Sequence, residues 1–374
     1  MTGKKFKSIG IVFLSIIYFT VLCMGSLSYA INSISYDNFI EGKYYIKNKG
    51  TSYFMSSVDF YSVVQTPYNP DTDLQKWELE YVSNGYYRVK NVYSGYYLTA
   101  AGAYYPGENI TETALSSSSS DQLWHFSETE IDTEYREYKI TAGSYVEDAF
   151  DLALTGDTTA TSYGYMVVQE EYSADTDYCD EWILIPCRDA YLVGITNTST
   201  NHEHTTCLNR VETTLLSDYF DVNRITTSAT TAYTVKTYMQ NSETFILRAD
   251  GGCDDIGTYM YLNSSDSTVK LHSWDLYNYN GNTGIDLSKC YVAVFAGCYT
   301  ADHATQSLPQ AATDAGAIYA VGFSGAPDCS LIAEWTKAFA TEYIITEVDV
   351  EAVVNDVNYD MGFNDSTVQA KTYQ

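Results

Sequence analysis

Two short turns in the second half of the chain hold residue types that can carry out nucleophilic chemistry. Cys298 follows an apolar stretch and one glycine, and Asp250 follows another apolar stretch and precedes Gly251 and Gly252. A thiol acts as a nucleophile when an imidazole stabilises the thiolate and protonates the leaving group. A carboxylate beside a thiol instead raises the pKa of the thiol through like-charge repulsion. Cys298 and Asp250 are therefore the candidate catalytic residues, and we expect them to form a weak or inactive hydrolytic site.

Four histidines in the same half of the chain are alternative sources of an imidazole. His202 and His204 follow an apolar stretch in an expected loop, His303 lies five residues after Cys298, and His272 lies in an expected hairpin strand. We expect each to be a surface or packing residue, and a substitute base among them stays an alternative. His202 and His204 have no third ligand at zinc-site spacing, so no metal or cofactor is expected.

The segments around Cys298 and Asp250 alternate between apolar strands and helices. The expected strands are 190–195, 244–247, 290–296 and 317–323, and the expected helices are 206–219, 232–240, 308–315 and 332–341. This alternation predicts a mostly parallel sheet that is covered on both faces. Ligands of such sheets bind outside the carboxyl ends of the strands, which is where Asp250 and Cys298 are expected.

The arrangement resembles the C-terminal half of caspase-like peptidases, which include gingipain, clostripain and CHAT-type domains. The resemblance covers about residues 190–345, with a small residue and then Cys298 at the exit of a buried strand. That family has a His-Gly turn after one strand and the nucleophilic Cys after the next, with the His some fifty residues upstream. Asp250-Gly251 occupies this place, 48 residues before Cys298. The resemblance therefore implies a caspase-like domain with a degenerate peptidase site.

The first half of the chain repeats one strand pattern three times between residues 36 and 187. The units open on alternating segments at 44–48, 87–91 and 138–141, and each closes on a tryptophan two residues after Gln or Asp. The closing residues are Gln75 with Trp77, Gln122 with Trp124, and Asp180 with Trp182. Three units of about four short strands, none able to bury its own apolar face, must share one core.

The Gln-x-Trp closures, with the segment Ser94-Gly95-Tyr96-Tyr97-Leu98, resemble the ricin B-type lectin β-trefoil over about 150 residues. The resemblance implies that three indoles pack around a pseudo-threefold axis and that each Gln amide holds the neighbouring turn. Carbohydrate binding is the function that it implies. In the sugar-binding members an Asp follows the Leu of this segment and binds two sugar hydroxyls, and an aromatic side chain stacks against the ring.

Two of the three units have no carboxylate at the sugar-binding position. Ser56 and Thr99 occupy it in the first two units, so Asp151 is the candidate in the third unit. Its aromatic partner is expected among Tyr163, Tyr165 and Tyr172. A role of these tyrosines in packing and in an uncharged polar surface stays the alternative.

The first thirty residues have the features of an export signal. Lys4, Lys5 and Lys7 precede an apolar run from Ile9 to about Met24, and Ser28-Tyr29-Ala30 has the small-x-small pattern that signal peptidase recognises. A membrane anchor is the alternative, but the run is short for one. We expect a secreted protein without a stable membrane anchor.

The net charge of the chain limits the classes of binding partner that we expect. Forty-eight acidic against 20 basic residues give a net charge of -28. Nucleic acid and anionic membranes are poor partners for such a chain, because each phosphate contact requires a cation.

Seven cysteines follow residue 30, an odd number, so at least one thiol is free in an oxidising compartment. Cys298 is the candidate free thiol, unless it is bridged to Cys253; Cys179 and Cys187 are close enough in sequence for a second bridge.

The sequence thus predicts two domains after a signal peptide at 1–30: an all-β trefoil of three pseudo-repeats over 36–187, and an α/β domain with a mostly parallel caspase-like sheet over 190–374. The preferred interpretation is a secreted carbohydrate-binding protein, with glycans or glycoproteins as partners and a degenerate peptidase site. Two alternatives stay open. One is a secreted cysteine endopeptidase that uses Cys298 on a peptide substrate and is directed to glycans by the trefoil. The other is a non-catalytic protein-interaction scaffold.

Overall fold

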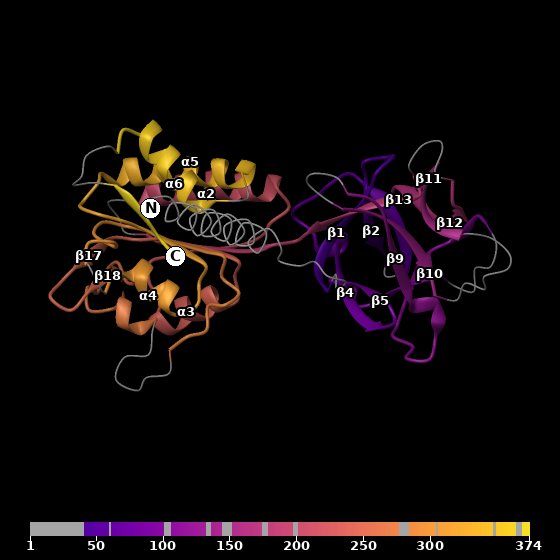
Figure 1. Cartoon of the computed structure of the whole chain (residues 1–374), viewed down its shortest axis with the longest axis horizontal. Helices are drawn as coiled ribbons and strands as arrows, with labels where there is room; N and C mark the ends of the chain where they lie inside the picture. Colours follow the sequence, from indigo (N-terminus) through magenta and orange to yellow (C-terminus); the bar gives the residue numbers. More distant parts are fainter. Residues whose placement is uncertain are drawn as a thin grey trace, which may run out of the picture.

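The computed structural model describes residues 41–59, 61–100, 106–131, 136–143, 152–173, 179–196, 201–276, 284–303, 306–346, 349–363 and 369–374. The expected export signal and Asp151 lie outside these ranges. Within them, no helix is both long enough and apolar enough to cross a bilayer. The chain forms two bodies, one built from strands and one from strands and helices (Figure 1).

The first body, indigo to magenta in Figure 1, joins thirteen of the described strands into one antiparallel network. They are β1 (Gly42–Asn48), β2 (Phe54–Val58), β3 (Ser62–Thr66), β4 (Lys76–Ser83), β5 (Tyr86–Asn91), β6 (Tyr97–Thr99), β7 (Glu108–Asn109), β8 (Thr111–Thr113), β9 (Trp124–Ile131), β10 (Arg136–Ala142), β11 (Leu152–Ala160), β12 (Tyr165–Glu171) and β13 (Glu181–Pro186). β1 pairs with both β4 and β13, so the first unit contacts the last strand of the third.

The three tryptophans that close the units share one core, as the sequence predicts. Trp77, Trp124 and Trp182 are fully buried in the same apolar cluster. Each indole Nε1–H donates to a main-chain carbonyl of its own unit: Met55 O at 2.9 Å, Leu98 O at 3.0 Å and Leu154 O at 2.7 Å. These bonds satisfy a donor that would be costly to bury unpaired. They also show that Met55, Leu98 and Leu154 are equivalent positions in the three units.

The Gln side chains hold the turns that precede the tryptophans. Gln75 donates from Nε2 to Thr66 Oγ1 and to a main-chain carbonyl, and Gln122 bonds in the same way to Thr113 Oγ1 and a main-chain carbonyl. Each Gln also accepts a bond from the main chain of its turn, at 2.8 Å and 2.7 Å. In the third unit Asp180 takes the place of the Gln and accepts from Ser173 N at 2.7 Å.

A buried carboxylate, Glu112, breaks the pseudo-threefold pattern. Thr66 and Thr113 are equivalent positions, so Glu112 of the second unit is equivalent to Gln65 of the first. Both side chains are fully buried. Gln65 accepts from Thr51 Oγ1 and donates from Nε2 to two main-chain carbonyls, those of residues 157 and 166. Glu112 Oε2 accepts from Ser94 Oγ at 2.8 Å and Ser57 Oγ at 3.0 Å. Its Oε1, where Gln65 has a donor, has no hydrogen-bond partner among the described residues.

Burial and, to a smaller extent, the charge of Asp59 raise the pKa of Glu112 to about 7, although its bonds to Ser94 and Ser57 lower it. The folded chain therefore holds this proton up to a higher pH than the unfolded chain does. By linkage, stability falls as the pH rises from the ordinary carboxyl pKa through about 7, because the charged form is buried with one unpaired oxygen.

We expect Glu112→Gln to stabilise the protein near pH 8 by about 2 kcal/mol, since a neutral amide avoids the cost of burying a charged carboxylate. The gain should shrink as the pH falls and be smallest below about pH 4, where Glu112 is mostly protonated in both states. Urea unfolding of both proteins across this pH range measures the difference. Glu108→Gln, at an exposed carboxylate on β7, is the control and should give a difference near zero. A gain that does not change with pH would contradict the account.

The second body contains a sheet in the order β15-β14-β16-β20-β21-β22. Its strands are β14 (Asp189–Ile195), β15 (Asp221–Thr227), β16 (Thr244–Arg248), β20 (Val292–Ala296), β21 (Tyr319–Phe323) and β22 (Ala370–Tyr373). The first five are parallel, and β22 runs antiparallel to β21. A small separate sheet follows β16, with β17 (Gly251–Cys253), β18 (Thr258–Tyr261) and β19 (Lys270–His272).

Helices cover both faces of this sheet, as expected (Figure 1). They are α2 (Asn201–Ser217), α3 (Ala232–Gln240), α4 (Leu308–Asp314), α5 (Cys329–Thr346) and α6 (Val350–Asp360). The apolar cluster on one face contains side chains of α2, α5 and α6, and the cluster on the other face contains those of α3 and α4. Nothing in the sequence analysis predicted β15, α6 or β22. β15 is an edge strand with partly exposed, polar residues, so it lacks the apolar run that marks a buried strand.

The two bodies meet at paired charges and at aromatic rings that pack in tilted and edge-on contacts. β13 ends at Pro186 and β14 begins at Asp189. Lys76 is 4% exposed and pairs with Asp221 at 2.8 Å, and Lys43 pairs with Asp189 and Asp221. Burial alone would raise the pKa of Asp221, but its bonds to Lys76 and Lys43 lower it overall. The ring of Tyr219 packs against those of Tyr45, Phe54 and Tyr68.

Candidate functional site

The predicted site residues of the second body follow adjacent strands. β16 and β20 are paired in parallel, so their carboxyl ends lie at the same edge of the sheet. Asp250 comes two residues after β16, and Cys298 comes two residues after β20. The structure therefore brings the two turns together, as the sequence predicts.

The two turns pack main chain against main chain. A Cβ atom on Gly251 would lie 2.3 Å from Cys298 O and 3.2 Å from Cys298 N. A Cβ atom on Gly297 would lie 2.5 Å from Ala249 O. Only glycine allows backbones to approach this closely. The glycines beside Asp250 and Cys298 are thus explained by contact between the turns, apart from any chemistry.

We expect Gly251→Ala to destabilise the protein by about 2 kcal/mol or more, because the new methyl group would overlap the carbonyl of Cys298. Urea unfolding measures this loss. Gly95→Ala is the control, since a Cβ atom there meets nothing within 4 Å but the residue has φ of +70°. That variant should lose about 1 kcal/mol from backbone strain alone. Equal losses would show that the contact with Cys298 is not tight.

The Cys298 side chain is half-buried and its partner is a carbonyl. The thiol donates to Pro327 O at 3.6 Å. Burial, with the charges of Cys329 and Asp250, raises the pKa of the Cys298 thiol, while Arg248 opposes this rise. The residue that follows, Tyr299, has φ of +59°, a strained conformation for a non-glycine residue. Burial and the neighbouring charges therefore favour the neutral form of the Cys298 thiol.

Arg248, at the last position of β16, is a buried cation that the sequence analysis did not assign. It is 1% exposed, and its Nη1 donates to Ala296 O at 2.7 Å and to Ala249 O at 3.4 Å. Its Nη2 donates to Cys329 O at 3.2 Å. One guanidinium thus joins the exits of β16 and β20 and the start of α5. An Arg at the end of an otherwise apolar strand is the sequence signal that could have found it.

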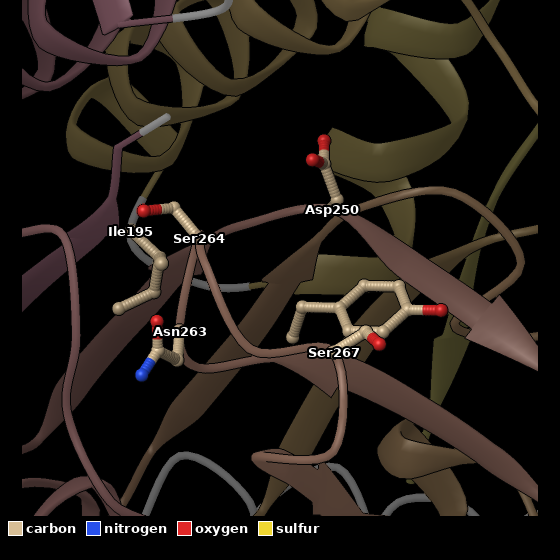
Figure 2. Close-up of a pocket in the computed structure, with 6 residues that line it drawn as sticks. Ile195, Asp250, Asn263, Ser264 and Ser267 are labelled. Carbon is tan, nitrogen blue, oxygen red and sulfur yellow. The ribbon is translucent and has the colours of Figure 1, made fainter. Parts of the chain in front are cut away.

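A small pocket opens at the same edge of the sheet. Its volume is about 190 Å³, and it is lined by Ile195, Asp250, Tyr261, Asn263, Ser264 and Ser267. Figure 2 shows Asp250 on one side of the pocket and Ile195 with Ser264 on the other. Cys298 is not among the lining residues. Asp250 therefore contributes to a polar pocket as well as to the turn beside Cys298.

The structure gives the positions of the four histidines in the fold, and the expected loop position of His202 and His204 is wrong. His202 and His204 lie in the first turn of α2 rather than in a loop, because the helix begins at Asn201; their side chains are outside the description. His272 lies in β19, as expected, and stacks on Trp274. His303 accepts a bond from Gln306 N at 3.1 Å.

The cysteine pairs that the sequence suggested are not bonded. Cys187, Cys253 and Cys298 are free thiols in the structure. Cys298 lies in the electrostatic field of Cys329, whereas the charges that act on Cys253 are those of Asp302, Asp254 and Asp255. Cys329 is therefore the neighbour of Cys298 that sequence proximity did not suggest.

In the first body the indole bonds give a register for the sugar-binding position. Because Leu154 is equivalent to Met55 and Leu98, the residue at this position in the third unit is Thr155, and Asp151 lies four residues away in sequence. Asp151 itself is outside the described residues. All three units therefore have a hydroxyl side chain where the sugar-binding members have Asp: Ser56, Thr99 and Thr155.

The three candidate tyrosines do not form one platform. Tyr165 begins β12 and stacks on Tyr53 of the first unit, with ring centres 5.3 Å apart. Tyr172 follows the far end of β12, about 20 Å away along an extended strand. Its hydroxyl donates to Glu181 at 3.3 Å, and Lys139 lies over its ring. Tyr163, which is 59% exposed, is the candidate with a ring available to solvent.

Comparison with known proteins gives one family match. Residues 73–162 match the family model described as ricin-type beta-trefoil lectin domain-like. The segment runs from the closure of the first unit into the third, and carries a ricin B-type trefoil lectin-like domain. Carbohydrate binding is the class of function that this domain suggests. The match ends before the second body, and no curated protein matches the chain.

Several solved structures are similar to part of the chain. They include the designed threefold-symmetric protein ThreeFoil (25% identity, 38% of this chain and 98% of that chain, TM-score 0.32), the Macrolepiota procera ricin B-like lectin in complex with lactose (19%, 38% and 94%, 0.31) and the Rhizoctonia solani agglutinin (19%, 40% and 96%, 0.31).

Proposed function

We propose that this chain is a secreted carbohydrate-binding protein whose second domain is a caspase-like scaffold with a degenerate peptidase site. The trefoil attaches the protein to glycans or glycoproteins. The second domain keeps the frame of a cysteine peptidase without the imidazole that its nucleophile needs. The observation that carries the first part is the family match over residues 73–162, and the placement of Asp250 beside Cys298 carries the second.

The shared core of the trefoil supports carbohydrate binding, whereas the carboxylate that binds sugar in the family is replaced. The indole and Gln bonds build the shared core of three units. The carboxylate position holds hydroxyls in all three units, so a sugar would be held by hydroxyl or main-chain groups and by an aromatic ring. Tyr163, beside the stacked pair of Tyr165 and Tyr53, offers such a ring.

The sheet of the second body supports the caspase-like proposal. Cys298 follows β20, and Asp250 follows the neighbouring strand β16, which is the relation that the family has between Cys and His. A carboxylate at the His position raises the pKa of the thiol and is a poor proton donor near neutral pH. The raised pKa of Cys298 agrees with lost hydrolysis.

Binding of the purified full chain to a glycan array tests the first part of the proposal. We expect binding to a restricted set of glycans, and Tyr163→Ala should weaken it by about fivefold, because ring stacking is worth about 1 kcal/mol. Tyr359→Ala, at a 74% exposed tyrosine on α6, is the matched control and should bind normally. No binding by the unmodified chain would refute carbohydrate binding. Normal binding by the Tyr163 variant would show that the binding site does not include Tyr163.

Hydrolysis of a mixed peptide library, followed by mass spectrometry, tests the second part. We expect no Cys298-dependent cleavage by the native chain. Asp250→His should raise cleavage at least about tenfold, because the imidazole supplies both thiolate stabilisation and a proton donor. Cys298→Ala in the same background should remove the gain. Cleavage by the native chain that Cys298→Ala abolishes would favour the endopeptidase alternative instead.

A further inference from the structure

Cys298 and Cys329 form a pair of thiols at the carboxyl edge of the sheet. Cys298 Sγ contacts Pro327 O at 3.6 Å, and Cys329 is two residues further along the chain, at the first position of α5. After burial, the charge of Cys329 is the largest influence on the pKa of Cys298. The two thiols are 31 residues apart in sequence, and the contact of Cys298 Sγ with Pro327 O packs the turn after β20 against the segment that leads into α5.

Arg248 holds both thiol-bearing segments in place. Its guanidinium donates to Ala296 O, two residues before Cys298, and to the carbonyl of Cys329 itself. Because the cation is buried and rigid, neither segment can move far without breaking one of these bonds. The separation of the two thiols is therefore set by a third residue, on a different strand.

These two thiols are also more accessible than the buried cysteines Cys187, Cys207 and Cys290. Cys298 and Cys329 are both partly exposed. Burial raises the pKa of Cys187 to about 12, of Cys207 to about 11 and of Cys290 to about 12. Cys253 is exposed on β17, but the charges that act on its thiol are carboxylates. A small reagent can therefore reach both members of the Cys298 and Cys329 pair.

We propose that Cys298 and Cys329 are a redox-active dithiol, which a low-molecular-weight disulfide such as oxidised glutathione converts into an intramolecular disulfide. The Cys329 thiolate attacks one sulfur of the oxidant, the S–S bond of the oxidant breaks, and one small thiol leaves. Cys298 then attacks the Cys329 sulfur of the mixed disulfide, and the second small thiol leaves. The two protons from the protein end on the two released thiols. The protein loses two electrons, and the oxidant gains them.

The first attack is assigned to Cys329 because the Cys298 thiol already donates to Pro327 O. The new bond would fasten the turn after β20 to the start of α5 and remove the free thiol at position 298. This inference goes beyond the proposed function and does not rest on it, since the exchange needs neither a glycan nor a peptide substrate.

Mass spectrometry of the purified full chain tests the dithiol. The chain is incubated with oxidised glutathione or with a reducing agent, its remaining thiols are blocked with N-ethylmaleimide, and it is cleaved on the N-terminal side of aspartates. This cleavage separates residues 286–301 from residues 328–348, whereas a tryptic peptide would contain both cysteines. We expect the two fragments to be joined after oxidation and separate, with both cysteines alkylated, after reduction.

Three variants make the assignment specific. Cys329→Ser should abolish the joined fragments and leave Cys298 alkylated or carrying glutathione. Cys253→Ser should leave the joined fragments unchanged. Cys290→Ser should also leave them unchanged, and this variant excludes the other cysteine of fragment 286–301. Fragments that stay separate after oxidation of the native chain, or a bond from Cys298 to Cys253, would overturn the proposal.

Discussion

The buried guanidinium of Arg248 is the interaction on which the edge of the second sheet depends. A cation that is 1% exposed must be compensated by acceptors, and here they are carbonyl oxygens from the exits of β16 and β20 and from the start of α5. The same group opposes the rise in the pKa of Cys298 that burial causes. Arg248 thus joins the exits of the two strands to the start of α5, and the glycines at 251 and 297 let the turns after the two strands pack main chain against main chain.

In the first body, buried donors also need acceptors, but here the donors are neutral indole groups. Three buried indoles each need an acceptor, and each finds a carbonyl at the equivalent place of its own unit. Two Gln side chains and one Asp then fix the turns before the tryptophans. Glu112 is the exception, because a carboxylate stands where the first unit has an amide donor. Pseudo-symmetry makes such an exception visible, since the neighbouring unit shows which bonds are expected.

The two bodies are joined by more than the peptide between β13 and β14. Lys76 belongs to the closure of the first unit, and its partner Asp221 begins β15 of the second body. Tyr219, just before β15, packs on rings of the first unit. A protein that binds glycans through the first body would therefore present the second body in a defined orientation, which suits a scaffold as well as an enzyme.

Much of this architecture could be predicted from the sequence. The Gln-x-Trp closures indicated three units with a shared core, because one tryptophan recurs at the end of each unit in the sequence. The apolar runs at 244–247 and 290–296 indicated buried parallel strands, and the turns after them indicated where Asp250 and Cys298 would lie. β15 and β22 were missed because edge strands lack an apolar run. Asp151 was chosen by counting from repeats of unequal length, and hydrogen bonds rather than counting fix a register.

The sequence by itself determined the composition of each element and the residue types at the carboxyl edge, since apolar periodicity and glycine placement are local properties. Only the tertiary structure decided which side chains are neighbours. Cys329 lies near Cys298, Glu112 is equivalent to Gln65, and Lys76 pairs with Asp221, all across segments whose separation in sequence carries no information about distance. The physical reason is that burial and charge act through space, so the pKa of a thiol or a carboxyl is set by groups that only folding brings together.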